Sequence, residues 1–160
     1  MYVLEERNTY LVYFWDNEII YEPPATRSVN ITWTGMLEKA TLYVEIGRDC
    51  VGRPWTLNRI TFNGNTVWSG RTTGAVSVDV TDLITKGSNH LRLDYEIPIP
   101  YFPACGARCT AYLEMVISGG EVKPIKPPGT APFPWESILY GGLVIAGIVA
   151  VAYLIRAVRR

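Results

Sequence analysis

Residues 58–68, NRITFNGNTVW, are the part of this chain that decides its fold. Ile60 and Phe62 alternate with polar residues, as in a strand with one buried face, and the apolar pattern resumes at Val67. Between them stands Asn63-Gly64, a pair that adopts the left-handed conformation of a two-residue turn at little cost. The stretch therefore predicts a β-hairpin.

A second stretch, VSVDVTDLITKGSNHLRLDY at residues 76–95, adds two strands and the connection between them. Its alternating apolar residues predict strands at 76–80 and 89–97. Between these strands we expect a single helical turn, with Thr81 as its N-cap and Gly87 as its stop.

The same alternation extends over most of residues 1–118, which we expect to form one domain. Two short apolar runs, 10–15 and 18–21, are separated by Asp16-Asn17, which predicts a further hairpin. Seven or eight short strands in this length predict an all-β, antiparallel sandwich. The remaining strands place apolar residues at Val29, Ile31 and Trp33, at Ala40, Leu42, Val44 and Ile46, and at Ala111, Leu113, Met115 and Ile117.

These motifs resemble those of the galactose-binding-domain-like jelly rolls, which occur as sugar-binding or accessory domains of glycoside hydrolases and in many surface proteins. In that family one strand ends in an Asn-Gly turn, as at Asn63-Gly64 here. The resemblance covers about residues 28–117 and implies a jelly-roll sandwich, but it implies little about function, because the motif residues build turns and core. The other matching residues are Asp79, Val80, Thr81, Asp82, Leu83 and Ile84, followed by Gly87, Asn89, Leu91 and Leu93.

Three loops should gather at one end of the sandwich if consecutive strands reverse direction: residues 47–57, 70–75 and 98–108. Loops held by a rigid scaffold commonly carry binding residues, so we interpret this end as a candidate recognition surface. The alternative is that its aromatic residues only plug the open end of the sandwich. The candidate partner-binding residues are Trp55, Arg71, Tyr101 and Phe102.

The three cysteines, Cys50, Cys105 and Cys109, fall in the same loops. In an oxidising compartment a long-range disulfide from Cys50 to one of the other two is feasible, as is a local Cys105–Cys109 bridge, and we favour the long-range pairing. A zinc site would need more ligands than these two neighbouring thiols, and only Cys50 and His90 remain. We therefore expect no metal.

Residues 138–155, ILYGGLVIAGIVAVAYLI, carry no charge. An α-helix of this length is about 27 Å long, close to the roughly 30 Å thickness of a bilayer's hydrocarbon core. We therefore expect a transmembrane helix at 135–156 and a basic tail at 157–160. The five prolines of residues 119–134 exclude a helix there and predict an extended spacer between domain and anchor.

Small residues lie on one face of the predicted anchor: Gly142, Ala146 and Ala150, with Gly147 beside them. Such a strip lets another helix approach closely, although small residues are also common in spanning helices in general. The arginines after the anchor place the carboxyl terminus in the cytoplasm by the positive-inside rule. The absence of a recognisable signal peptide favours the opposite arrangement, a tail anchor with a cytoplasmic domain, so both orientations stay open.

Catalysis and nucleic-acid binding find little support. His90 is the only histidine and lies on the strand face opposite Leu91 and Leu93, so no nucleophile–base constellation can be argued and we expect neither an enzyme nor a cofactor. Residues 1–118 hold 10 Lys and Arg against 13 Asp and Glu, a net charge of −3. That balance provides no broad basic surface for a phosphate backbone.

We carry three hypotheses for function. The first is a non-enzymatic, membrane-anchored structural or attachment protein, either a minor virion protein or a cell-envelope component. The second is a stalked carbohydrate-binding module, and the third is an accessory subunit of a membrane enzyme complex. The expected partners are the lipid bilayer, a protein partner or a second copy of the chain, and, under the second hypothesis, a glycan.

Overall fold

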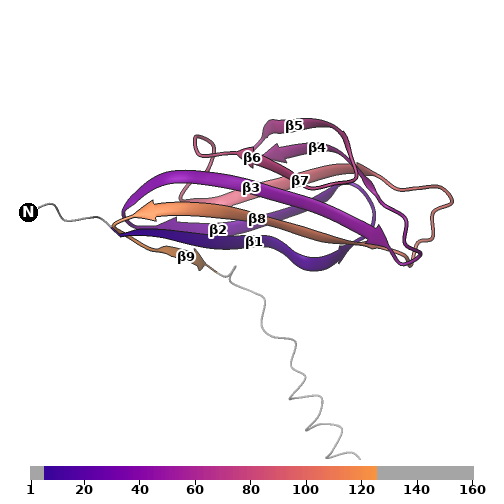
Figure 1. The fold of residues 1–160 in the computed structure, drawn as a ribbon, viewed down its shortest axis with the longest axis horizontal. Coiled ribbons are helices and arrows are strands. Elements are labelled where there is room, and N and C mark those ends of the chain that lie inside the picture. The colour runs from indigo at the N-terminus through magenta and orange to yellow at the C-terminus, as the bar shows by residue number, and fades with distance from the viewer. Residues whose placement is uncertain (1–5, 126–160) are drawn as a thin grey trace, which may run out of the picture. The chain divides into compact units, whose positions relative to one another are not determined.

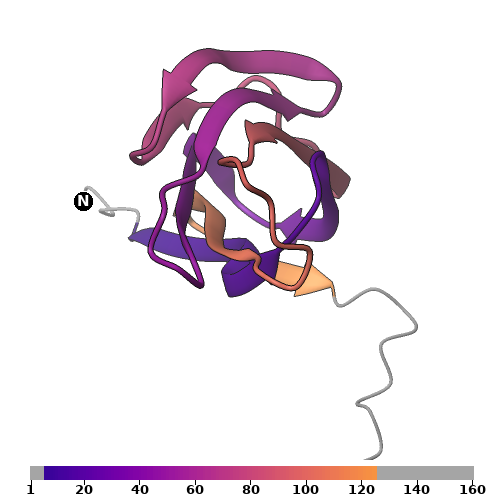
Figure 2. The same ribbon diagram turned by 90° about the vertical axis from the view of Figure 1, so that its right-hand side faces the viewer.

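The computed structural model describes residues 6–125 of the chain, which form nine β-strands and no helix. The strands build two antiparallel sheets that pack face to face (Figures 1 and 2). The predicted all-β sandwich is therefore confirmed. The four-stranded sheet has the order β1 (Arg7–Ile20), β8 (Ala107–Ser118), β3 (Met36–Asp49), β6 (Val76–Asp79). The five-stranded sheet has the order β5 (Asn65–Thr72), β4 (Thr56–Phe62), β7 (Gly87–Glu96), β2 (Ala25–Trp33), β9 (Val122–Ile125).

The pairing of the first eight strands is nested. The hairpin β4–β5 is the innermost pair, and β3 with β6, β2 with β7 and β1 with β8 follow outward, each pair antiparallel. The chain is thus a long hairpin whose two arms are rolled into a sandwich. Since successive strands reverse direction, the connections after β1, β3, β5 and β7 all lie at one end, which we call the loop end (right-hand side of Figure 1).

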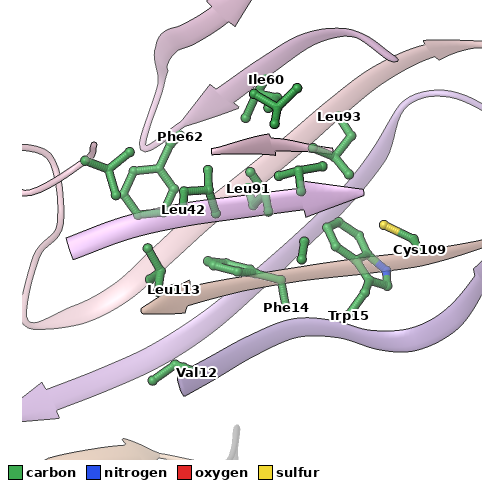
Figure 3. Packing of buried hydrophobic residues seen from close by; sticks show 14 of the residues in the cluster. Val12, Phe14, Trp15, Leu42, Ile60, Phe62, Leu91, Leu93, Cys109 and Leu113 are labelled. Carbon is green, nitrogen blue, oxygen red and sulfur yellow. The ribbon is translucent and has the colours of Figure 1, made fainter. Parts of the chain in front are cut away.

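The core lies between the sheets and consists of the inward-facing residues of both. Ala40, Leu42 and Val44 of β3 have no exposed surface, and neither have Leu93 of β7 or Leu113 of β8. Figure 3 shows Leu42 and Leu113 of the four-stranded sheet and Leu93 of the five-stranded sheet, with their side chains in the space between the sheets. The alternation that predicted the strands is the alternation that fills the core.

The predicted hairpin at Asp16-Asn17 is wrong, because β1 continues through these residues as one strand. Its register against β8 shifts twice, between Tyr13 and Trp15 and between Trp15 and Glu18. The first irregularity turns both Phe14 and Trp15 into the core, which a regular strand cannot do. Asn17 does take the left-handed conformation, with φ of 55°, but within a bulge and not a reversal.

The predicted helical turn at 81–87 is a hydrogen-bonded turn without a helix. The N–H groups of Leu83 and Ile84 both donate to the carbonyl of Val80. Thr81 is not an N-cap, because its hydroxyl accepts the N–H of Ala40, 2.9 Å away on β3. Gly87, with φ of 109°, opens β7 and does not close a helix.

A buried asparagine ties this turn to the Asn63-Gly64 hairpin. Asn89 has no exposed surface, and its side chain exchanges hydrogen bonds with the backbone of Thr85, donating at 2.7 Å and accepting at 2.9 Å. It also accepts from Asn63 Nδ2 at 2.9 Å. Asn63 and Gly64 both have positive φ, as the two-residue turn requires. The predicted hairpin is confirmed, and the motif residues here build turns and core.

The start of the predicted spacer belongs to the sandwich. Residues Val122–Ile125 form β9, which pairs with Asn30–Trp33 at the edge of the five-stranded sheet. An edge position tolerates Pro124, because one side of an edge strand needs no donor. The rest of the predicted spacer, the anchor at 135–156 with Gly142, Ala146, Gly147 and Ala150, and the tail at 157–160 lie outside the described residues. Within residues 6–125 we find no helix long and apolar enough to cross a membrane.

Candidate functional site at the loop end

A disulfide joins two connections at the loop end. Cys50, after β3, is bonded to Cys105, before β8, and the two Cα atoms lie 5.4 Å apart. The bridge links positions 55 residues apart in sequence, so it fixes the β3–β4 loop against the β7–β8 loop. This is one of the long-range pairings that the sequence favours. Cys109 lies not in a loop but in β8, where it is a free thiol buried in the core.

Arg53 braces the same two loops. Its Nε donates to Asp49 Oδ2 at 3.0 Å, and its Nη1 donates to the carbonyl of Pro100 at 2.8 Å. Its guanidinium carbon lies over the ring of Phe102, 5.4 Å from the centroid. One side chain thus reaches its own loop, the neighbouring loop and an aromatic ring at the surface.

The carboxylate of Asp49 anchors this brace. Burial disfavours its charged form, but hydrogen bonds from the N–H and side chain of Arg53 and from the N–H of Val51 outweigh that cost. Together they lower the pKa of Asp49. This partly buried ion pair is therefore charged at neutral pH and links the two loops.

Exposed apolar side chains lie on the segments that meet at this end. Of the eight large apolar side chains exposed in the described part of the chain, five lie at the loop end, and Ile99 is 93% exposed. The end of β1 packs closely against the β7–β8 loop, because a Cβ on Gly106 would overlap Ile19 Cγ2 and the carbonyl oxygen of Ile20. We use the name apolar patch for Ile19, Tyr21, Val51, Ile99 and Phe102.

Trp55 is not part of this surface. It has no exposed area and stacks on Tyr95, with ring centroids 5.4 Å apart and an interplanar angle of 22°. The hydroxyl of Tyr95 in turn donates to the carbonyl of Tyr21 at 3.2 Å. Trp55 is thus buried and offers no surface to a partner in this structure, as the alternative expects of a residue that plugs the end of the sandwich.

The other three candidates lie at the loop end in different settings. Phe102 is 48% exposed and Tyr101 is half-buried. Arg71 is exposed on β5 and forms a two-pronged ion pair with Glu96, with one N–O distance of 2.7 Å and the other of 3.1 Å. Sequence reasoning missed Ile19, Tyr21, Val51 and Ile99. Only the apolar run IPIPYFP at residues 97–103 signalled part of this set.

The outer face of the four-stranded sheet carries a row of tyrosines that sequence reasoning also missed. Tyr13, Tyr112 and Tyr43 lie at one register on β1, β8 and β3. Tyr112 stacks on Tyr43 at 4.9 Å and 20°, and Tyr13 lies 5.3 Å from Tyr112. Tyr43 and Tyr112 thus cover one face of each other, whereas Tyr13 is tilted at 51° against Tyr112. A hydrogen bond to Glu45 raises the pKa of Tyr43 to about 12.

A shallow depression of about 500 Å³ lies on the outer face of the five-stranded sheet, lined by residues that include Thr26, Ser28, Thr61 and His90. Ser28 Oγ is 2.5 Å from His90 Nδ1, and Ser88 Oγ is 3.3 Å from Nε2. The imidazole is thus placed between two hydroxyls, and no carboxylate of residues 6–125 is hydrogen-bonded to either nitrogen. Ser28 and His90 face each other in mid-strand, and the N–H of His90 donates to Asn63 Oδ1 at 2.7 Å.

Acidic residues and thiols do not gather into a metal site in the part of the chain that the structure describes. Asp79 serves the turn after β6, where its carboxylate accepts the hydroxyl of Thr81 at 2.6 Å and the N–H of Thr81 at 2.9 Å. These hydrogen bonds lower the pKa of Asp79.

Comparison with known proteins gives little further guidance. No family model matches the chain. No curated protein matches it either. Among solved structures, it is similar in part to an active-site mutant of a family two carbohydrate esterase from Clostridium thermocellum, with 16% sequence identity and a TM-score of 0.33. The match covers 75% of this chain and 35% of the esterase chain, so this chain spans about a third of the esterase's length.

Proposed function

We propose that this chain is a non-enzymatic, membrane-anchored attachment protein of a virion or a cell envelope, and that it binds a protein partner through the loop end. The observation that carries the proposal is the apolar patch on a braced frame. A disulfide, a partly buried ion pair and a close backbone approach at Gly106 hold the patch in place. A rigid, exposed apolar surface is what protein–protein contacts commonly use.

The composition of the patch supports a protein partner over a glycan. Sugar rings stack on open aromatic faces, but Trp55 is buried and one face of Phe102 is covered by Arg53. Exposed aliphatic side chains such as Ile99 and Val51 instead suit the apolar pockets of another protein. The carbohydrate-binding alternative therefore has less support at this end.

The strand order supports a jelly roll as the finer description of the sandwich. Rolling a long hairpin produces the nested pairs from β1 with β8 to β4 with β5, and it leaves β9 as an addition at one edge. Jelly rolls occur in viral capsid proteins and lectins, so this topology suits a structural or attachment role on a surface.

The disulfide supports one orientation in the membrane. Disulfides form and persist outside the reducing cytoplasm. A bridge between Cys50 and Cys105 therefore favours a sandwich on the oxidising side, with the arginines after residues 135–156 on the cytoplasmic side, as the positive-inside rule also predicts.

A photo-crosslinking amino acid in place of Phe102 tests the attachment role in membranes of the source. We expect one discrete protein adduct, and we expect Ile99→Ser to abolish it, since Ile99 is too exposed to matter for folding. The same crosslinker at Thr66, exposed on β5 beside the Asn63-Gly64 turn at the opposite end, is the control. Equal adducts at both positions, or none at either, would contradict a protein-binding loop end. Adducts to glycans at residue 102 would favour the carbohydrate alternative.

The anchor needs a separate test, because the loop end can bind whether or not the chain spans a membrane. The full chain should resist alkaline carbonate extraction, and a chain ending at residue 134 should not. Ala146→Leu or Gly142→Leu should weaken helix association in a membrane two-hybrid assay, whereas Val149→Leu on another helix face should not. Equal behaviour of the three variants would mean that the segment only tethers.

A further inference from the structure

The strand β1 is the long free edge of the four-stranded sheet. Within residues 6–125 it pairs with β8 alone, on one side (Figure 1). Every second residue of a strand turns its N–H and C=O away from the neighbour, so part of the β1 backbone faces outward without a strand partner. Pairing with β8 is regular from Arg7 to Tyr13, before the bulge at Phe14.

The other sheet edges carry features that discourage pairing with a further strand. β6 and β9 are four residues long, and β9 contains Lys123 and Pro124. β5 is irregular, with two register shifts against β4. In contrast, residues 8–13 of β1, NTYLVY, contain no charge, no proline and no bulge. Natural edge strands seldom stay this open unless a strand covers them.

The open stretch has a defined end. Arg27 on β2 donates from Nη1 to the carbonyl of Phe14 at 2.8 Å and also pairs with Glu18 at 2.6 Å. The side chain thus occupies the edge from Phe14 onward. A visiting strand therefore has only residues 8–13 to pair with.

We propose that β1 of a second copy covers this edge, antiparallel, with the two-fold axis at Leu11. In that register Leu11 faces Leu11 of the second copy, Tyr13 faces Thr9, and Tyr10 faces Val12. Two of these three pairs join an aromatic with a β-branched residue, a favourable cross-strand combination, and none joins like charges. The sequence of the edge is thus complementary to itself, which is what an isologous contact requires.

The side chains at the seam are already exposed and positioned. Leu11 is 48% exposed and Tyr13 is 41% exposed on the outer face of the sheet. Tyr13 is held against Tyr112, which stacks on Tyr43. Pairing at Leu11 joins the two four-stranded sheets into one, in which each tyrosine row runs up to the shared seam.

Cysteine crosslinking of the full chain in detergent tests the pairing. Leu11→Cys places two thiols opposite each other, so mild oxidation should give a covalent dimer at least about ten times faster than Met36→Cys, which is 60% exposed on β3 and away from the seam. Background from native cysteines is low, because Cys50 and Cys105 are bonded and Cys109 is buried. Equal rates for the two variants would overturn the proposal.

The register has its own test. Thr9→Cys and Tyr13→Cys chains should crosslink when mixed and not when either is oxidised alone. Adding Leu11→Lys to both should abolish the mixed product, since it sets two ammonium groups face to face, whereas Met36→Lys should leave it unchanged. Crosslinking of either chain alone at the mixed rate would refute the Leu11 axis. In source membranes, Leu11→Cys adducts with a different protein and none with itself would show that another chain covers the edge.

Discussion

Arg53 and Phe102 hold each other across two loops that are joined by the Cys50–Cys105 disulfide. The guanidinium lies 5.4 Å from the ring centroid and also donates to the carbonyl of Pro100. The charged group covers one face of the ring, and Phe102 as a whole remains 48% exposed. Phe102 is therefore a preorganised surface aromatic, whereas Trp55, close by in sequence to Arg53, is a core residue.

Phe102→Ala and Trp55→Ala should consequently affect different properties. Phe102→Ala should weaken binding at the loop end, and Trp55→Ala should lower the stability of the fold. Removing Phe102 should cost less than about 1 kcal/mol of unfolding free energy, since only a partly exposed cation–π contact and surface packing are lost. Removing Trp55 should cost about 3–5 kcal/mol, because it leaves a cavity beside Tyr95. Thermal denaturation of the full chain in detergent measures both, and the crosslinking assay at the loop end measures binding. A Phe102 variant that melts as early as the Trp55 variant would place Phe102 in the core.

Gly106→Ala should destabilise the loop end. A methyl group there overlaps Ile19 Cγ2 and the carbonyl of Ile20, so the β7–β8 loop must move away from the end of β1. We expect a loss of about 1–3 kcal/mol in unfolding free energy, typical of overpacking.

Gly74→Ala is the matched control, because its nearest non-adjacent atom, Thr72 Oγ1, would lie 3.6 Å from the new methyl group. This substitution should leave the unfolding free energy within about 0.5 kcal/mol of the parent. Equal losses for the two alanine variants would argue against a specific contact at Gly106.

Alternation predicted most of the sandwich because it records which face of a strand is buried. Leu42, Val44, Leu113 and Met115 all point inward as their spacing indicates. The Asn63-Gly64 turn was predictable for the same reason, since its conformation is local. The continuation of β1 through Asn17 was not, because a left-handed asparagine suits a hairpin and a bulge equally well. Pairing with β8, distant in sequence, decides between them.

A shift of register also hid the inward position of Trp55. Trp55 and Leu57 both point inward, but a shift between Leu57 and Arg59 moves the buried positions to Ile60 and beyond. No residue type marks that shift in the sequence. Cys109 was recoverable, because it continues the inward spacing of Ala111 and Leu113. The apolar patch assembles from three separate segments, and only the fold brings them together.

Asp49 should make the stability of the loop end depend on acid pH. Its pKa is lowered in the folded protein and lies near 3.9 in an unfolded chain. The ionised carboxylate therefore stabilises the fold above about pH 4, and this contribution is lost as the pH falls through the lower, folded pKa. The unfolding free energies of the parent and Asp49→Asn should differ most near pH 7 and converge towards pH 2.

The comparison requires a control for loss of charge alone. Asp82→Asn, on the exposed turn after β6, removes the same charge without a buried ion pair. Its difference from the parent should stay small at every pH. A difference for Asp49→Asn that does not change between pH 7 and pH 2 would contradict the ion-pair argument.

The disulfide should contribute substantially to stability. Replacing Cys50 and Cys105 together by serine frees a long stretch of the unfolded chain, and we expect a loss of about 2–4 kcal/mol in unfolding free energy. The double variant avoids a stray thiol that could pair with Cys109. Chemical denaturation of the full chain in detergent, with the parent under non-reducing conditions, gives the comparison. An unchanged midpoint and slope would show that the two loops are held without the bond.

Cys109 should resist alkylation until the chain unfolds. Its thiol is buried in the core, and burial raises its pKa to about 12, so at pH 8 it stays protonated as well as inaccessible. Iodoacetamide should therefore label no cysteine in the native, non-reduced protein, Cys109 alone after denaturation, and all three after denaturation with reduction. Peptide mapping by mass spectrometry distinguishes these states. Labelling of native Cys109 would contradict its burial in the core, and a Cys105–Cys109 peptide pair would contradict the Cys50–Cys105 disulfide.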